Sequence, residues 1–239
     1  MFKNFNKVLI NVFIIVLSFF PAVLAETDLE LVAPGGGEAD LQENVVKYYA
    51  DGPNLVVVNW GNFKLEAKFL EYQHQKSILK ANGSVRLTQK EPLQVLRCED
   101  IVADLTRDHF QASGSVKLKY DETTDISGEL LEWESQTEQF SLIGGVVVNY
   151  SGWKITGEKV AGDFKSDSFV IFGPVHAINE KNSMRAGRVI VDRSIEKMTL
   201  LENPVVINGK NELSATEIVY DLKTKKVSAS GVVKSRVIE

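Results

Sequence analysis

The sequence predicts an all-β protein in which repeats build an antiparallel β-sheet that folds into a V or a β-jelly-roll. A motif of about thirty residues recurs six times along the chain. Each copy contains runs in which apolar and polar residues alternate, and short polar segments typical of turns separate these runs. A period in this range is typical of stacked two-strand units rather than of one closed core. We therefore expect the function to lie in a long shared surface or groove.

The first 25 residues have the pattern of a secretory signal peptide. Lys3 and Lys7 precede an apolar run from Val8 to Phe20, and small or branched residues lead up to Ala25. The alternative is an uncleaved membrane anchor, but the run has only 13 residues, and a membrane-spanning helix needs about 20. Cleavage near Ala25 moves the formal charge from −5 to −7, because two lysines leave. Such an acidic, exported chain has no basic stripe for nucleic acid.

Residues 26–44 are predicted to form a flexible leader, because Pro34 and the three glycines after it favour an exposed, irregular chain. Two strand-like runs follow at 45–49 and 55–60. These runs resemble a degenerate seventh copy of the motif, as expected for a terminal repeat that needs a different outer edge. We expect residues 45–239 to form one domain of about six to seven two-strand repeats.

Each of the six copies combines a small residue, an apolar residue three positions later and a second anchor 16 or 17 positions after the small residue. The small residues are Ala67, Cys98, Gly128, Gly157, Ala186 and Ala215. The apolar partners are Leu70, Ile101, Leu131, Val160, Val189 and Ile218. The second anchors are Gly83, Gly114, Gly144, Gly173, Asn203 and Gly231.

The strand around the second anchor alternates with a period of two. In the second copy Phe110, Ala112 and Gly114 share one face with Val116 and Leu118, and the residues between them are mostly polar. This alternation is typical of a strand that buries one face. A recurring glycine on that face has two interpretations, a bend in the strand or the close approach of a ligand or backbone. We favour the bend, because its recurrence would crease the whole sheet.

The strand around the first small residue changes parity. Leu96 and Cys98 share one face of a regular strand, whereas Ile101 and Ala103 fall on the other. A β-bulge would return all four side chains to one face, and bulges mark the corners of folded sheets. Both strands of a repeat are therefore predicted to bend near the middle and to enclose an apolar interior.

A polar residue, usually an acid, opens the turn after each of these strands. The series could suggest a ladder of metal sites, but the glycine-rich nonapeptides of calcium-binding repeats are absent. We expect each side chain to cap its own turn, and we predict no metal site. The series is Gln73, Asp104, Glu134, Asp163, Asp192 and Asp221.

The sequence contains no convincing catalytic set. His74, His109 and His176 occupy different phases of the repeat, so they are not expected to converge. Cys98 fills a slot that alanine or glycine fills elsewhere, which predicts an inert, buried thiol. No motif for a serine hydrolase, a zinc protease or a phosphate loop is present. We predict that the protein is not an enzyme and needs no cofactor, with a carbohydrate-active enzyme using paired acids as the disfavoured alternative.

The pattern resembles the OstA-like repeat family of periplasmic lipopolysaccharide-transport bridge proteins, the LptA family. The matching segments are Leu65-x-Ala67-x-x-Leu70-x-Tyr72 and Leu213-x-Ala215-x-x-Ile218-x-Tyr220, each followed by a small-x-Gly-x-Val run that ends at Val85 or Val233. The resemblance covers about residues 45–239. The insertion of one residue at Asn203-Pro204 departs from the simplest form of the pattern.

The resemblance implies a periplasmic β-jelly-roll that is open at both ends and carries lipid A acyl chains inside. It also implies head-to-tail assembly with an LptC-like inner-membrane anchor and an LptD-like outer-membrane translocon, and possible self-association. The apolar side chains on the inward face would then line the lipid path. These are Leu79, Val85, Leu87, Phe110, Val116, Leu118, Phe140, Leu142, Val146, Val148, Phe169, Ile171, Val175, Val205 and Ile207.

Three alternatives remain open. The same side chains could simply fill a closed core, which would suit a structural or adhesive β-repeat protein that binds no lipid. The chain could be an LptC-like component of the same pathway that keeps its N-terminal segment as an anchor. A β-helical enzyme acting on polysaccharide is the third alternative, and it would depend on an acidic pair rather than on the apolar face.

Overall fold

The structure is a computed structural model that describes residues 29–60, 62–91, 93–107, 109–134, 137–163 and 167–237. The predicted signal peptide, residues 1–25, lies outside the described residues. The chain divides into two compact units, Met1–Arg107 and Asp108–Glu239. Both are built from antiparallel strands, as the repeat pattern predicts, and each unit is described by itself.

In the first unit, two short antiparallel ladders share the long strands β7 and β8. One ladder runs β2–β3–β6–β7, and the other runs β1–β4–β5–β7. The strand pair β7–β8 spans both ladders with a shift in register between Asn82 and Val85. The strands are β1 (Leu29–Val32), β2 (Gly37–Asp40), β3 (Val45–Tyr49), β4 (Val56–Trp60), β5 (Phe63–Ala67), β6 (Phe69–Gln73), β7 (Ile78–Gln89) and β8 (Gln94–Asp104), with a 3-10 turn at His74–Lys76.

Part of the segment predicted to be a flexible leader is ordered as strands. β1 pairs with β4, and β2 pairs with β3. The turn between them places the Gly36 backbone at φ +82°, and the Gly35 amide donates to the Tyr49 carbonyl at 2.9 Å. The glycines therefore form a tight turn between two edge strands, and the prediction of a flexible leader over residues 26–44 is wrong for residues 29–40.

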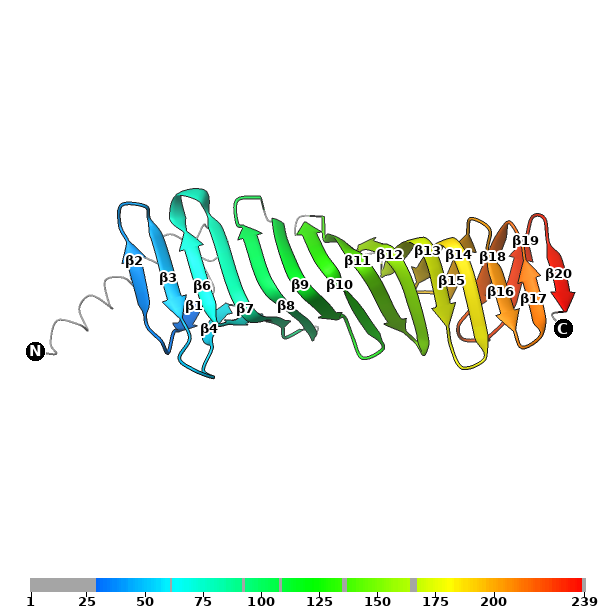
Figure 1. The fold of residues 1–239 in the computed structure, drawn as a ribbon, viewed down its shortest axis with the longest axis horizontal. Helices are drawn as coiled ribbons and strands as arrows, with labels where there is room; N and C mark the ends of the chain where they lie inside the picture. Colours follow the sequence, from blue (N-terminus) through cyan, green and yellow to red (C-terminus); the bar gives the residue numbers. More distant parts are fainter. Residues whose placement is uncertain are drawn as a thin grey trace, which may run out of the picture. The chain divides into compact units, whose positions relative to one another are not determined.

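In the second unit, six long strands are followed by three pairs of shorter ones. Figure 1 shows these strands following one another in chain order, from green to red. The long strands are β9 (His109–Lys119), β10 (Thr124–Glu134), β11 (Gln139–Tyr150), β12 (Trp153–Asp163), β13 (Ser168–Ile178) and β14 (Asn182–Asp192). The short strands are β15 (Lys197–Leu201), β16 (Val205–Asn208), β17 (Asn211–Ser214), β18 (Glu217–Asp221), β19 (Val227–Ser230) and β20 (Lys234–Val237).

The pairing of the short strands divides the second unit into two arms. β15, β18 and β19 extend the half of β14 that contains Val189, and we call this side arm A. β16, β17 and β20 extend the half that contains Met184, and we call this side arm B. Through the strand pairing, one half of each strand from β9 to β13 belongs to arm A and the other half belongs to arm B. Each long strand thus crosses from one arm to the other.

The crossing point of each odd-numbered long strand is the predicted bend. The register of β11 shifts between Ile143 and Val146, and Gly144 and Gly145 between them have φ of +85° and +57°. The same place in β7 and β9 has Gly83-Ser84 and Gly114-Ser115, all with positive φ. Two consecutive residues in this region turn the chain sharply, which confirms a recurring bend at the second anchor.

In the strands that pair with these bent strands, the inward-facing positions shift by one residue after the small residue, as predicted. Leu96, Cys98 and Ile101 are all buried in β8, and Ile126 and Leu131 are both buried in β10. The small and apolar positions of each repeat therefore face the same interior, which confirms the folded sheet.

The turns confirm the capping role of the aspartates. The Asp104 carboxylate accepts from the Thr106 amide at 3.0 Å and the Arg107 amide at 3.1 Å. Asp221 accepts from the Thr224 amide at 2.7 Å. The backbone amide of Thr224 holds the pKa of Asp221 below its usual range. The Thr106 hydroxyl, together with the amides of Thr106 and Arg107, does the same for the pKa of Asp104. These carboxylates are therefore engaged within their own turns.

A helix of sufficient length and apolar character to cross a lipid bilayer is not found in the described part of the chain.

Replacing Gly144 by alanine tests the bend. A Cβ at this position would lie 2.6 Å from the Glu129 Cβ, in a backbone conformation that L residues rarely adopt. We expect Gly144→Ala to lower the free energy of unfolding by about 2–3 kcal/mol. Gly145→Ala is the control, because its Cβ meets nothing within 4 Å, and it should cost about 1 kcal/mol. Equal losses in chemical denaturation would contradict the close packing at Gly144.

The reactivity of Cys98 tests the burial of the small-residue slot. Burial, with a smaller contribution from Asp100, raises the pKa of the Cys98 thiol to about 12 from 9.0. Alkylation of the folded protein at pH 8 should therefore be on the order of a hundredfold slower than in denaturant. The neutral thiol favours the folded state below pH 9.0, and this stabilisation declines as pH rises toward about 12. Rapid alkylation of the folded protein would show that the slot opens.

Candidate functional site

The candidate site is the apolar interior between the two arms of the second unit. Val116, Val148 and Ile171 have relative exposures of 0 %, and Leu142 has 1 %. Side chains from both arms fill this space, so the interior is occupied by the protein's own residues. Apolar burial of this kind is the main stabilising contribution to a sheet protein without disulfides.

Most of the predicted lining residues face this interior or the equivalent face of the first unit. Leu79, Leu87 and Phe110 lie on the same face as their buried neighbours but are half-buried near strand ends. Whether any of them binds lipid stays a prediction. The fully buried members of the set are Val85, Val116, Leu118, Phe140, Leu142, Val146, Val148, Phe169, Ile171 and Val175.

Val205 and Ile207 do not face the interior, and their predicted orientation is wrong. Val206 is the buried residue of β16, and it pairs with the buried Met184 of β14. Val205 pairs instead with the exposed Arg185. The bend of the fifth repeat begins at Glu202, 16 positions after Ala186 as in the other repeats, and not at Asn203. The predicted inward positions were therefore one residue too late, and side chains of a strand alternate between faces.

The sequence pattern missed several large side chains of the interior. They lie near the ends of strands, close to turns, where the repeat pattern assigns no fixed position. Parity continued backwards from Ile155 would have placed Trp153 inside. Tyr150 and Tyr220 are buried as the repeat pattern places them, although the predicted lining set left them out. The residues that the pattern missed include Trp153, Ile155, Met184, Met198 and Val206.

Aromatic contacts join the two arms at the strand ends that lie away from the bends, which we call the rims. The ring of Trp153 in arm B lies 5.1 Å from the ring of Tyr220 in arm A, at an interplanar angle of 76°. Tyr150 in arm B meets Phe169 in arm A at 6.1 Å and 82°. Edge-to-face pairs of this kind stabilise beyond their area burial by about 0.5–1.5 kcal/mol. We call this row of contacts the seam.

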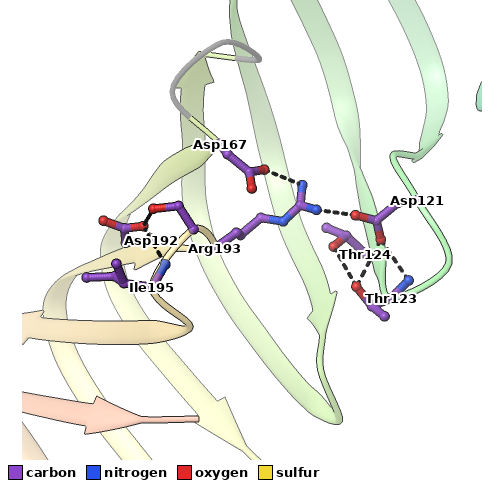
Figure 2. Close-up of polar contacts among 8 residues, drawn as sticks. Asp121, Thr123, Thr124, Asp167, Asp192, Arg193 and Ile195 are labelled. Atoms are coloured by element: carbon purple, nitrogen blue, oxygen red, sulfur yellow. Dashed lines mark hydrogen bonds and ion pairs between the residues drawn. The ribbon is translucent and has the colours of Figure 1, made fainter. Parts of the chain in front are cut away.

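Arg193 continues the seam with ionic contacts (Figure 2). It follows β14 at the end of arm A, and its Nη2 donates to Asp121 at the end of arm B. Its Nη1 contacts Asp167 Oδ1 at 3.1 Å, and the guanidinium lies 4.5 Å from the ring centre of Tyr120. The Arg193 side chain is 15 % exposed. A guanidinium shared by two carboxylates and an aromatic face ties the rims together.

The Asp121 carboxylate is held in its charged form. Burial acts to raise its pKa, but the amide and hydroxyl of Thr123 and the charge of Arg193 outweigh burial, so the pKa of Asp121 lies below its usual range. The Thr123 amide donates to Asp121 at 2.7 Å. The carboxylate therefore remains an anion partner for Arg193 at neutral pH.

A small cavity of about 10 Å³ lies inside the seam. Its size allows no more than about one water molecule. Around Arg193 the seam is therefore closed over the buried side chains of the interior. The cavity is lined mainly by Tyr120, Thr124, Ile126, Phe140, Phe169 and Arg193.

No cluster of three or more His, Cys, Asp or Glu side chains suited to a metal ion occurs in the described part of the chain. His109 Nδ1 lies 2.9 Å from the Glu134 carboxylate, and His176 is exposed on another strand. Together with the half-buried His74, these histidines lie on different strands or turns of the fold.

Comparison with known proteins identifies similarity to solved structures only. No family model matches the chain, and no curated protein matches it. The chain is similar to the crystal structure of LptH from Pseudomonas aeruginosa, described as the LptA-homologous periplasmic component of the conserved lipopolysaccharide transport device. The identity is 15 %, the TM-score is 0.45, and the match covers 48 % of this chain and 95 % of that chain.

Removing the Asp121 charge tests the ionic part of the seam. Asp121→Asn should lower the free energy of unfolding by about 1–3 kcal/mol at pH 7, because Arg193 loses a charged acceptor. Since the pKa of Asp121 is lowered from 3.8 in the folded state, its contribution is present above about pH 3.8 and is lost as pH falls further. The variant should lack this part of the acid dependence.

The matched control is Asp125→Asn, which alters an exposed side chain of the neighbouring strand β10. It should leave both the stability at pH 7 and the acid profile close to wild type. If Asp121→Asn and Asp125→Asn behave alike in denaturant titrations from pH 2 to pH 7, Arg193 does not tie the rims together.

Proposed function

We propose that this protein binds lipopolysaccharide by its lipid A acyl chains between the arms of the folded sheet. In this proposal it carries the glycolipid across the periplasm as one segment of a head-to-tail bridge to the outer membrane. The observation that carries the proposal is the inner face itself, on which every long strand of the second unit places buried apolar side chains. The sequence resemblance to the OstA-like repeat family supports the same function.

The energetics of acyl chains favour such a carrier. Moving one methylene group out of water stabilises by about 0.8 kcal/mol. A long acyl chain exposed to water therefore costs on the order of 10 kcal/mol, and lipid A carries several chains. A glycolipid of this kind needs an apolar path to cross an aqueous compartment, and an apolar face that continues from strand to strand provides one.

The closed seam requires the arms to part when lipid binds. Within the described residues, the strand ladders run inside each arm, and the cross-rim contacts named above are between side chains. Parting the rims therefore breaks aromatic and ionic contacts but leaves the ladders intact. The bends at the second anchors, where backbone ladders are already interrupted, are the natural hinges.

Strand edges that have no partner strand among the described residues would suit end-to-end assembly. β19 and β20 pair on one side with β18 and β17 and are largely exposed. An unpaired strand edge recruits another strand by β-augmentation unless it is blocked. We propose that such edges join the chain to an LptC-like anchor, an LptD-like translocon or a second copy of itself.

The proposal assigns no enzymatic activity and no cofactor to the chain. It places the mature protein in the periplasm after cleavage near Ala25. N-terminal sequencing of the mature protein separates this from an LptC-like anchored component: a start at Glu26 supports the cleaved carrier, and a retained Met1 supports the anchor.

Photocrosslinking in intact cells tests the lipid path. A photoreactive residue placed at Val116, Phe140 or Ile171 should form adducts with lipopolysaccharide, because these side chains face the interior. Lys117 and Gln111, which lie exposed on β9, the strand that also contains Val116, are the outward-facing controls and should form no adducts. A folded protein without adducts at any of the three inward positions would contradict the proposal and favour a structural protein with a filled core.

A further inference from the structure

Two N–H groups in the seam are buried and have no hydrogen-bond acceptor among the residues that the structure describes. One is Nε1 of Trp153, whose side chain is 1 % exposed. The other is Nε of Arg193, whose two Nη atoms are engaged by Asp121 and Asp167. Folded proteins pair the great majority of buried donors, because an unpaired one loses its water without compensation. Two unused donors along the same seam therefore point to a ligand that supplies acceptors.

Both donors lie where an acylated ligand would change from apolar to polar. Trp153 begins β12 directly after the turn at 151–152 and packs against Tyr220 across the rims. Arg193 follows the last residue of β14 and reaches across to Asp121. The seam separates the apolar interior from the solvent-exposed turns. If acyl chains fill the interior, the first polar atoms of the ligand lie at this level.

The charges around Arg193 select among possible acceptors. Two carboxylates, Asp121 and Asp167, surround one guanidinium, so the cluster already carries an excess of negative charge. A phosphate group would add to that excess and compete with both carboxylates. Parting of the rims separates Arg193 from Asp121 but leaves Asp167, which lies at the end of the same arm, so a neutral carbonyl oxygen can accept the Nε–H without disturbing the remaining ion pair. The indole N–H of Trp153 likewise needs one neutral acceptor and has no charge to offer.

We infer that Trp153 Nε1–H and Arg193 Nε–H donate hydrogen bonds to the ester or amide carbonyl oxygens that link acyl chains to the head group of a bound glycolipid. This inference rests on the proposed function and adds to it the chemical group that the seam recognises. Recognition of the linkage would fix how far the acyl chains enter, whereas the apolar interior alone sets no depth.

Equilibrium binding of two probes by the full mature chain tests the inference. The probes are purified hexa-acylated lipid A and the same lipid A after removal of its phosphates. Trp153→Phe keeps the aromatic ring and removes the N–H, and Arg193→Lys keeps the charge and removes Nε–H. Each variant should bind both probes about 3- to 10-fold more weakly than wild type, as expected for the loss of one hydrogen bond.

Stability and a matched control separate binding from folding. The free Trp153→Phe protein should remain folded and unfold cooperatively, because the relief of an unpaired donor partly offsets the cavity left by the smaller ring. Arg185→Lys is the control, because Arg185 is exposed on β14 and lies on the outer face. It should bind both probes as wild type does.

Three results would overturn the inference. Wild-type affinity in both variants would show that the donors do not contact the ligand, while the proposed function would stand. A loss confined to the phosphorylated probe in Arg193→Lys would assign phosphate recognition instead. Failure of the wild-type protein to bind either probe, together with an absence of interior crosslinks, would remove the proposed function as well.

Discussion

The fold depends on one backbone constraint, the pair of consecutive positive φ angles at the bend of its strands. At Gly144 and Gly145 the chain turns sharply while the ladders on both sides continue. Because the bend recurs in successive repeats, it creases the sheet and brings two apolar faces together. Backbone hydrogen bonds are satisfied within each arm, so the space between the arms is left to side chains. The secondary structure therefore does not depend on backbone hydrogen bonds between the arms.

The sequence was sufficient for the bends and the buried faces, because both follow from local rules. Alternation with a period of two defines the inward face, and the parity change at each small residue defines the corner. The same reasoning failed at the fifth repeat, because the pattern takes Asn203 as the anchor, whereas the bend begins at Glu202. Glu202 and Asn203 both take positive φ, 16 and 17 positions after Ala186, as Gly144 and Gly145 do after Gly128, which places Val206 inside. A pattern that expects glycine or asparagine at the bend does not identify a glutamate in that role.

The seam could not be predicted for a different reason. Arg193 and Asp121 are separated by 72 positions in the chain, and neither belongs to the repeated pattern. Their contact depends on how far the arms close, which no local pattern encodes. The ordering of residues 29–40 has the same origin, since these strands are held by pairing with β3 and β4 rather than by a repeat of their own. Contacts that arise from closure or from edge pairing need the folded structure.

A filled interior is compatible with carriage of lipid if the exchange is nearly balanced. When an acyl chain enters, contacts between facing side chains such as Trp153 and Tyr220 are replaced by contacts with the chain, and the total apolar burial on the protein side changes little. The gain is then the removal of the acyl chain from water, at about 0.8 kcal/mol per methylene. The opposing cost is the loss of the aromatic and ionic contacts of the seam. In the proposed function, a closed seam would therefore weaken binding below what acyl burial alone would give, and this suits a carrier that has to pass its cargo on.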